Sequence, residues 1–427
     1  MNQPAERRLA LHCCSPMIAP PPASLPAPAA PLTGWRSLPR GVWAMGFGSL
    51  FMDMSSELIH SLLPVLMVTT LGASMVTVGV IEGVAEATAA ITKVFSGALS
   101  DYLGKRKFLT VFGYALAAFT KPIFPLATSV SWVFAGRFFD RVGKGIRGAP
   151  RDALIADITP PEVRGASFGL RQALDTVGAV FGPIAAIAAL AWFAGDFRMA
   201  FWLAVIPAFL AVVLIVLGVD EPERRKEGAK GKRLWLADAR RLPLAFWLVT
   251  GIAALMALAR CSEAFLVLRA ADVGLAVGQA PWVMVAMTLV YTVAAYPAGA
   301  ALDRGRGATM LYAGLAALVA AHATLAYATS AVAVFAGAGL WGLHMGLTQG
   351  LFSAMVAEHA PADLRGSAFG VFNLASGVAM LLASGIAGAL WDAAGARAAF
   401  ALGATIALLT VIALAAARRT LARHEAR

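Results

Sequence analysis

Charged residues are scarce in this chain of 427 residues, because Asp, Glu, Lys and Arg together make up only 14% of it. An average soluble domain contains about 25%. Hydrophobic residues make up 59%, and the mean hydropathy is +0.73. A soluble protein of this composition would expose far too much apolar surface, and a disordered chain needs the opposite composition. The composition therefore excludes a soluble enzyme and predicts that lipid is the main solvent of the chain.

Cysteine is almost absent, with Cys13, Cys14 and Cys261 as its three copies. Three cysteines are too few for a disulfide framework and show no metal-binding spacing, so we expect no metal site and no cofactor. The chain also lacks the glycine-rich loop ending in Gly-Lys-Ser/Thr that binds nucleotide phosphates. It contains no nucleophile elbow either. These absences argue against an ATP-driven pump and against an enzyme.

Long hydrophobic runs are what the chain has instead. A membrane-spanning helix needs about 20 apolar residues, and runs of this length fall into two sets of six. The first set covers 41–71, 76–99, 108–128, 132–156, 166–194 and 199–219, and the second covers 243–268, 281–302, 309–329, 331–357, 367–391 and 398–415. The predicted fold is an all-α membrane protein with 12 transmembrane helices in two pseudo-symmetric six-helix bundles.

The net charge of +11 lies mainly between these runs. Lys and Arg gather in alternate loops, in the linker 220–242 and in the tail 418–427, where the positive-inside rule places cytoplasmic segments. Residues 1–40, rich in Pro and Ala, are expected to form a disordered cytoplasmic tail, unless translation begins at Met17. We expect bundles at 41–219 and 243–417, both termini in the cytoplasm, and the lipid bilayer rather than nucleic acid as partner.

The two sets of runs repeat one another. The segment 156–169, Ala-Asp-Ile-Thr-Pro-Pro-Glu-Val-Arg-Gly-Ala-Ser-Phe-Gly, recurs as 357–370, Ala-Glu-His-Ala-Pro-Ala-Asp-Leu-Arg-Gly-Ser-Ala-Phe-Gly, at a register of 201 residues (357 − 156). Shorter matches pair 97–101 with 299–303, and Ser56-Glu57 with Ser262-Glu263. Two homologous halves in parallel orientation are typical of a transporter that rocks around a central site.

Three motifs of the chain resemble those of the major facilitator superfamily. The run 97–107, Gly-Ala-Leu-Ser-Asp-Tyr-Leu-Gly-Lys-Arg-Lys, is similar to that family's loop motif between helices 2 and 3. Arg137 with Asp157 resembles its helix 4 motif, and 178–183, Gly-Ala-Val-Phe-Gly-Pro, resembles the helix 5 motif of its antiporters. The block 140–154 resembles a bacterial and archaeal subgroup of predicted permeases. The resemblance implies a monomeric transporter of the bacterial inner membrane.

The resemblance also implies a gating role for residues of these motifs. Asp101 is expected to dock on the start of a helix in the opposite half, near 366–367. Gly97 and Gly104 are expected to allow close backbone approach, and Arg106 to bind lipid headgroups or acids in other loops. The helix 5 motif is expected to pack tightly against the other half. The predicted gating residues are Gly97, Asp101, Gly104, Arg106, Gly178, Gly182 and Pro183.

Ionisable side chains within the predicted spans crowd into the first half of the chain. Each costs about 2.5–3.5 kcal/mol to insert into a bilayer, so each needs a partner or a function. A carboxyl group shielded from water can take up a proton, and an approaching arginine can expel it, which predicts proton coupling. The predicted coupling residues are Asp53, Glu57, Glu86 and Arg137. The predicted substrate-cavity residues are His60, Glu82, Asp140, Arg141, Lys144, Arg147, Arg260, Glu263 and His344.

The second half provides an internal control for these charges. At the 201-residue register, Arg137 and Lys144 become Ala338 and Met345, so the fold does not require charges there. A buried ion pair that only supports the fold is the competing interpretation for any one of them. The wall formed by the second half is expected to be aromatic and apolar, with Trp282, Tyr291, Tyr296, Trp341 and Phe352 as candidates.

The function favoured by these patterns is proton-coupled export of a small organic molecule by antiport, and the helix 5 motif is the main reason. The alternative is a proton symporter that imports an anionic metabolite or a metal chelate, which the Arg and Lys stripe of the fourth span favours. A receptor or scaffold without transport is the candidate from another class. It predicts that nothing depends on Asp53 or Glu57.

Overall fold

The computed structural model describes residues 38–221, 241–348, 351–361 and 364–425. Nearly all of the expected tail 1–40 and most of the linker 220–242 lie outside the described residues. The described part forms helices and no strands. The first half holds α1 (Arg40–Thr69), α2 (Met75–Leu103), α3 (Arg106–Thr120), α4 (Ile123–Leu126), α5 (Val130–Ile158), α6 (Arg164–Trp192) and α7 (Phe197–Gly218).

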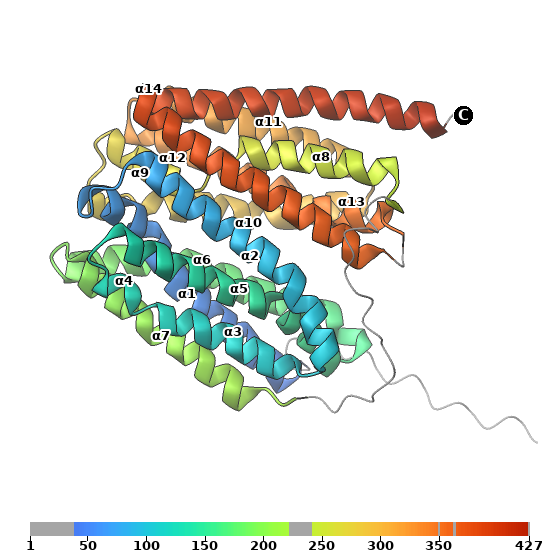
Figure 1. Cartoon of the computed structure of the whole chain (residues 1–427), viewed down its shortest axis with the longest axis horizontal. Coiled ribbons are helices and arrows are strands. Elements are labelled where there is room, and N and C mark those ends of the chain that lie inside the picture. Colours follow the sequence, from blue (N-terminus) through green and yellow to red (C-terminus); the bar gives the residue numbers. More distant parts are fainter. Residues whose placement is uncertain (1–37, 222–240, 349–350, 362–363, 426–427) are drawn as a thin grey trace, which may run out of the picture.

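The second half holds α8 (Leu244–Ala259), α9 (Ala264–Asp272), α10 (Trp282–Asp303), α11 (Gly307–Ala326), α12 (Ala331–Thr348), α13 (Leu351–His359) and α14 (Arg365–Glu425). Two short 3₁₀ helices, Pro161–Val163 and Val277–Gln279, lie in connecting segments. In Figure 1 the helices coloured blue to green form one bundle, and those coloured yellow to red form the other.

These helices make twelve membrane spans, which confirms the predicted fold class. Three spans contain two helices each: α3 and α4 cover Arg106–Leu126, α8 and α9 cover Leu244–Asp272, and α12 and α13 both belong to the predicted run 331–357. The helix α14 contains the last two spans, separated at Gly395, whose φ of 81° takes the backbone out of the helix. Apolar composition alone does not identify α5 as a membrane span, because charged side chains recur along it from Arg137 to Asp157.

The two ends of the bundles are distinguished by the chain connections. At the end that we call the linker side, α1 begins at Arg40, α7 ends at Gly218 and α8 begins at Leu244. The linker side is the right-hand end of Figure 1. We call the opposite end, where α1 turns into α2 and α6 into α7, the far side.

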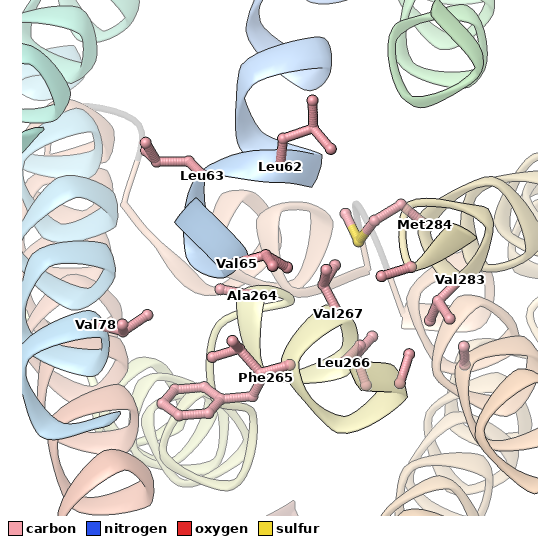
Figure 2. Close-up of a cluster of buried hydrophobic side chains, with 14 of the residues drawn as sticks. Leu62, Leu63, Val65, Val78, Ala264, Phe265, Leu266, Val267, Val283 and Met284 are labelled. Atoms are coloured by element: carbon pink, nitrogen blue, oxygen red, sulfur yellow. The ribbon is translucent and has the colours of Figure 1, made fainter. Parts of the chain in front are cut away.

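Buried apolar side chains join the two bundles on the far side. One cluster combines Leu62, Leu63 and Val65 of α1 with the stretch 264–267 of α9. Val78 of α2 and the start of α10 belong to the same cluster, and Figure 2 shows these side chains converging between the bundles. Two further clusters lie toward the linker side, and each draws its buried members from a single bundle. The bundles are therefore sealed together on the far side, whereas each has its own core toward the linker side.

Small residues bring α2 of the first half against α14 of the second half. A Cβ atom at Gly79 would overlap the carbonyl oxygen of Ser384, and one at Gly83 would lie 2.9 Å from the Cα of Leu381. Farther along this seam, a Cβ atom at Gly377 would lie 3.3 Å from the Cα of Ala87. Close backbone packing of this kind stabilises helix pairs in lipid, where dispersion contacts drive association.

A carboxylate from the second half also caps a helix of the first half on the far side. Asp392 of α14 accepts hydrogen bonds from the backbone N–H of Met75 (3.0 Å) and of Val76 (2.8 Å), the first two residues of α2. Ser74, the N-cap residue, accepts a third bond from Thr77. The first N–H groups of a helix have no hydrogen-bond acceptor inside that helix. Asp392 therefore provides, from the other bundle, the acceptors that the start of α2 lacks.

Candidate functional site

A cavity of about 560 Å³ lies between the two bundles, bounded by segments that run from mid-membrane toward the linker side. This volume is within the range of small-molecule sites, roughly 300–1,000 Å³. The first half contributes the ionisable wall: Asp53, Glu86, Lys93, Lys144, Arg147, Arg151, Asp152, Arg171 and Asp175. The second half contributes Arg260 and an otherwise mainly apolar wall: Ala253, Met256, Ala257, Phe352, Phe372, Ser376, Gly377 and Met380.

The helix α5 supplies most of the basic side chains, and its glycines explain its position. A Cβ atom at Gly143 would lie 2.7 Å from the carbonyl oxygen of Gly113 in α3, and one at Gly145 would lie 2.9 Å from that of Ala89 in α2. The helix is thus clamped between α2 and α3. Its polar residues then face in different directions, some into the bundle and some into the cavity.

The deepest charges form a network beneath the cavity. His60 of α1 lies between two carboxylates, with Nδ1 3.4 Å from Glu57 Oε2 and Nε2 3.3 Å from Glu82 Oε2. Arg137 of α5 also binds Glu82, and both members of this pair are almost fully buried. A buried carboxylate is tolerated only with such partners, because desolvation of an unpaired charge costs several kcal/mol.

Two further ion pairs connect α5 to its neighbours. Lys121, at the end of α3, donates to Asp140 Oδ1 (2.9 Å) and to the hydroxyl of Ser56 (2.9 Å). Arg141 lies 3.3 Å from Glu86, whose side chain reaches the cavity wall. These pairs tie α1, α2, α3 and α5 together, so they fix the position of the cavity wall.

On the cavity wall, Asp53 of α1 lies 3.5 Å from the guanidinium of Arg147. The carboxyl groups of Asp53 and of Asp175 of α6 line the same cavity and interact electrostatically. Asp175 in turn lies 3.3 Å from Arg171 and 3.9 Å from Arg151. The wall therefore contains two adjacent carboxyl groups surrounded by arginines, and two such groups can share one proton.

Comparison with known proteins identifies the family of this architecture. The family model described as Major Facilitator Superfamily matches residues 45–265 and 263–427, which together are most of the chain. The chain belongs to the Major Facilitator Superfamily. An uncharacterized MFS-type transporter of Methanocaldococcus jannaschii is 30% identical over 364 residues, covering 83% of this chain and 89% of that protein. An uncharacterized protein of Mycobacterium tuberculosis is 28% identical over 371 residues, covering 84% and 88%.

Solved transporters share the superfamily fold. A POT family transporter in complex with 5-aminolevulinic acid matches with a TM-score of 0.74 and 15% identity, covering 90% of this chain and 97% of that one. A bacterial homolog of the lysosomal transporter Spinster, solved in an inward-facing conformation, matches with a TM-score of 0.69 and 15% identity, covering 90% and 97%. These likenesses show the fold alone. Membership of the superfamily makes the protein a multi-pass membrane transporter and not an enzyme.

The structure brings part of the predicted site together. Asp53 and Glu86, predicted for proton coupling, line the cavity, as do Lys144, Arg147 and Arg260, predicted for the substrate. The arginine beside Asp53 in this structure is Arg147, and Arg137, predicted to approach a coupling carboxyl group, binds Glu82. Glu57 is half-buried, bonded to His60 and outside the cavity lining.

Six predicted cavity residues lie elsewhere, which corrects that part of the prediction: His60, Glu82, Asp140, Arg141, Glu263 and His344. The first four belong to the buried ion pairs beneath the wall, because helix periodicity does not say which neighbour a polar face meets. His344 is buried among second-half helices, where Nδ1 lies 2.9 Å from the carbonyl oxygen of Gly314. Glu263 is half-buried next to α9, outside the lining.

Among the aromatic residues expected along the second-half wall, only Phe352 lines the cavity. Trp341 is fully buried, while Trp282 and Tyr296 are exposed and do not line the cavity. Conversely, six polar lining residues of the first half were not predicted for the cavity: Lys93, Arg151, Asp152, Arg171, Gln172 and Asp175. Lys93 lies seven residues after Glu86, and this helical spacing places both on one face of α2.

Among the gating residues of the loop motif, Gly97 faces α5, where a Cβ atom would lie 3.4 Å from Ala149. Gly104 ends α2 with a φ of 66° and has open space around it, so conformation rather than close approach requires glycine there. Arg106 binds Asp157 at 2.5 Å, as expected for a contact with an acid in another segment. The side chain of Asp101 lies outside the described residues, so its docking near 366–367 stays a prediction.

The motif 178–183, which resembles the helix 5 motif of the superfamily, lies in α6. It packs differently from its prediction. A Cβ atom at Gly178 would overlap the carbonyl oxygen of Leu50, and one at Gly182 would lie 2.6 Å from the Cβ of Glu57. Both glycines thus face α1 of the same bundle and not the other half. Pro183 is buried one residue beyond, inside α6. The motif brings α6 against the face of α1 that carries Asp53, and this contact permits the pairing of Asp53 with Asp175.

Proposed function

We propose that this protein is a proton-coupled secondary transporter that moves a small organic solute across the bacterial inner membrane by alternating access. The observation that carries the proposal is the Asp53–Asp175 carboxyl pair on the wall of a cavity between two bundles. Neighbouring carboxylates repel each other, and a shared proton relieves that repulsion. Arg147 competes with the proton for Asp53.

Coupling follows from which helices carry these groups. Asp53 lies on α1 and Asp175 on α6, and these two helices also contact α9 and α10 of the second half. A proton bound between them changes the charge at the point where the bundles meet, so it biases how the bundles pack. The cavity then alternates between the two sides of the membrane. We place the linker side in the cytoplasm because the basic loops gather there, which makes this structure inward-open.

Two directions of transport are candidates. Export by antiport is supported by the resemblance of the α6 glycine and proline positions to antiporters of the superfamily. Import by symport is supported by the excess of basic side chains on the cavity wall. Membrane vesicles of opposite orientation separate them. Accumulation driven by an inward proton gradient only in right-side-out vesicles establishes symport, whereas proton-driven accumulation in everted vesicles establishes export.

The proposal is tested by measuring solute and proton fluxes together in proteoliposomes that contain a pH-sensitive dye. Asp53→Asn should abolish proton movement and proton-driven accumulation but retain solute exchange, because Asn fills the same space without binding a proton. Asp272→Asn is the matched control, since Asp272 pairs with Arg269 at the far-side end of α9. Proton flux that persists in Asp53→Asn, or that is lost equally in Asp272→Asn, would refute the proposal.

A further inference from the structure

The cavity wall carries more positive charge than its own acids neutralise. Among the described lining residues, six are basic (Lys93, Lys144, Arg147, Arg151, Arg171 and Arg260) and four are acidic (Asp53, Glu86, Asp152 and Asp175). Every one of the four acids has an arginine within 4.0 Å: Arg147 for Asp53, Arg141 for Glu86, Arg151 for Asp152, and Arg171 for Asp175. Each acid of the wall is thus already paired with an arginine.

Three cations remain without an acidic partner. Lys93, Lys144 and Arg260 have no carboxylate within 4.0 Å among the residues that the structure describes, and all three line the cavity. Lys93 and Lys144 are exposed, whereas Arg260 is half-buried. Cations that line a cavity and form no ion pair with the described residues are available to a ligand, so these three side chains point to an anion.

The three cations are placed to surround a ligand from two bundles. The stem of Lys93 of α2 passes alongside Gly148 of α5, where a Cβ atom would lie 3.6 Å from the Lys93 Cδ. Lys144 lies one helical turn before Gly148, so the two lysines share one face of the cavity. Arg260 faces them from the second half, at the residue where α8 ends. An anion held between them would contact both bundles at once.

We propose that the transported solute is a small organic anion with at least two negative charges, a polycarboxylate or a phosphate ester, held by Lys93, Lys144 and Arg260. The apolar residues of the second half, among them Met256, Phe372 and Met380, would contact its carbon skeleton. The proposal rests on the proposed transport function and names its substrate class.

The same charges select between the two directions. Asp53 faces Asp175 of α6 and Lys144 and Arg147 of α5. A proton taken up by this group removes one negative charge from the wall, so the anion binds more tightly to the protonated cavity. By thermodynamic linkage the effect is reciprocal, so a bound anion also increases the affinity of the cavity for the proton. Mutually reinforcing binding of proton and anion produces symport, whereas antiport needs competition.

Binding is measured by calorimetry on the purified full-length protein, at fixed ionic strength and without any gradient. The probes are citrate and succinate for the carboxylate arm, glycerol 3-phosphate for the phosphate arm, and succinamide and putrescine as neutral and cationic references. At least one anion should bind and the references should not. Lys93→Gln, Lys144→Gln and Arg260→Gln should each weaken anion binding about 10-fold or more, as expected for lost charge-assisted contacts.

Two controls separate a binding role from a structural one. Lys105→Gln removes an exposed lysine between α2 and α3 and should leave binding unchanged. Lys144→Arg retains the charge and should retain binding, which attributes the loss in Lys144→Gln to the missing charge, provided that both variants unfold at the temperature of the native protein. Binding of succinamide or putrescine in preference to the anions would overturn the proposal, and so would binding of no anion.

The test is independent of proton coupling. Anions that bind as predicted, in a protein whose fluxes carry no protons, would refute the proposed coupling and leave the substrate class intact. Proton-coupled flux of a neutral or cationic solute would refute the substrate class and leave the coupling intact.

Discussion

Removal of the Asp392 carboxylate should shift the protein toward the state that is open on the far side. In this structure Asp392 of α14 accepts the N–H groups of Met75 and Val76 of α2, and it is the side chain that caps one bundle from the other. The contact can exist only while the far side is closed. Asp392→Ala therefore destabilises the closed state selectively.

The size of the shift follows from the energy of a helix cap. Loss of a capping side chain costs about 0.5–2 kcal/mol, and its charge contributes through the helix dipole. Asp392 is exposed, and water can replace it at both N–H groups. We therefore expect Asp392→Ala to destabilise the closed state by about 1 kcal/mol. The ratio of open to closed states should rise about 5-fold.

A buried residue of the far-side cluster reports on this ratio. Val78 is 0% exposed and lies where the bundles meet. In a chain without its native cysteines, Val78→Cys should react with a maleimide only when the far side opens. Asp392→Ala in this background should raise the labelling rate about 5-fold.

A matched control exists in α7. Asp196 caps α7 within the first bundle, accepting from the N–H of Arg198 (2.8 Å) and of Met199 (3.3 Å). Asp196→Ala should lower thermal stability but leave the labelling of Val78→Cys unchanged, because no contact between bundles is lost. An unchanged rate in Asp392→Ala, or an equal rise in Asp196→Ala, would contradict the role of Asp392 as a contact that holds the far side closed.

Four further substitutions test the packing and the buried charges. Gly79→Leu should prevent closure and raise far-side labelling, because its side chain would overlap the carbonyl oxygen of Ser384; slow labelling would show that the seam tolerates bulk. Arg137→Met should cost about 3–5 kcal/mol of stability in thermal unfolding, because it leaves Glu82 buried without a full partner. The double variant with Glu82→Leu should recover most of that loss, and no recovery would mean that the pair matters for another reason. Gly182→Ala should lower the melting temperature by forcing α6 away from α1, and an unchanged value would show that the contact can relax.

The twelve spans could be predicted from the sequence because each is a run of apolar residues about as long as the bilayer is thick. The break of the last helix could also be placed, since the predicted runs stop before Gly395 and resume after it. The run 132–156 was among them, although charged side chains recur along α5. The length of an apolar run depends only on consecutive residues, so it can be read directly from one sequence.

The pairing of charges could not be predicted, because it depends on which helices face each other. The charges of α5 were expected to form one polar stripe. The structure divides them: Arg137 meets α2, Asp140 meets the end of α3, and Arg147 meets α1 at the cavity. Helical spacing gives the direction of a side chain around its own axis but not the neighbour in that direction. Arg137, predicted to approach a coupling carboxyl group during a helix rearrangement, binds Glu82 in this structure.

The contacts that close the far side had no sequence signal either. Asp392 looks like an ordinary polar residue between two spans, and its counterpart at the 201-residue register is Ala191. Its role arises only when α14 and α2 are brought together by glycines in both helices. A contact between bundles is set by their relative placement, which no motif of a single helix encodes.

The central claim is that protonation at Asp53 and Asp175 biases the packing of the two bundles. The most direct measurement is the labelling rate of Val78→Cys as a function of pH, in the absence of solute. The rate should change with pH in the otherwise native protein, and Asp53→Asn should make it independent of pH. A labelling rate that is independent of pH, or one that keeps its pH dependence in Asp53→Asn, would contradict the claim.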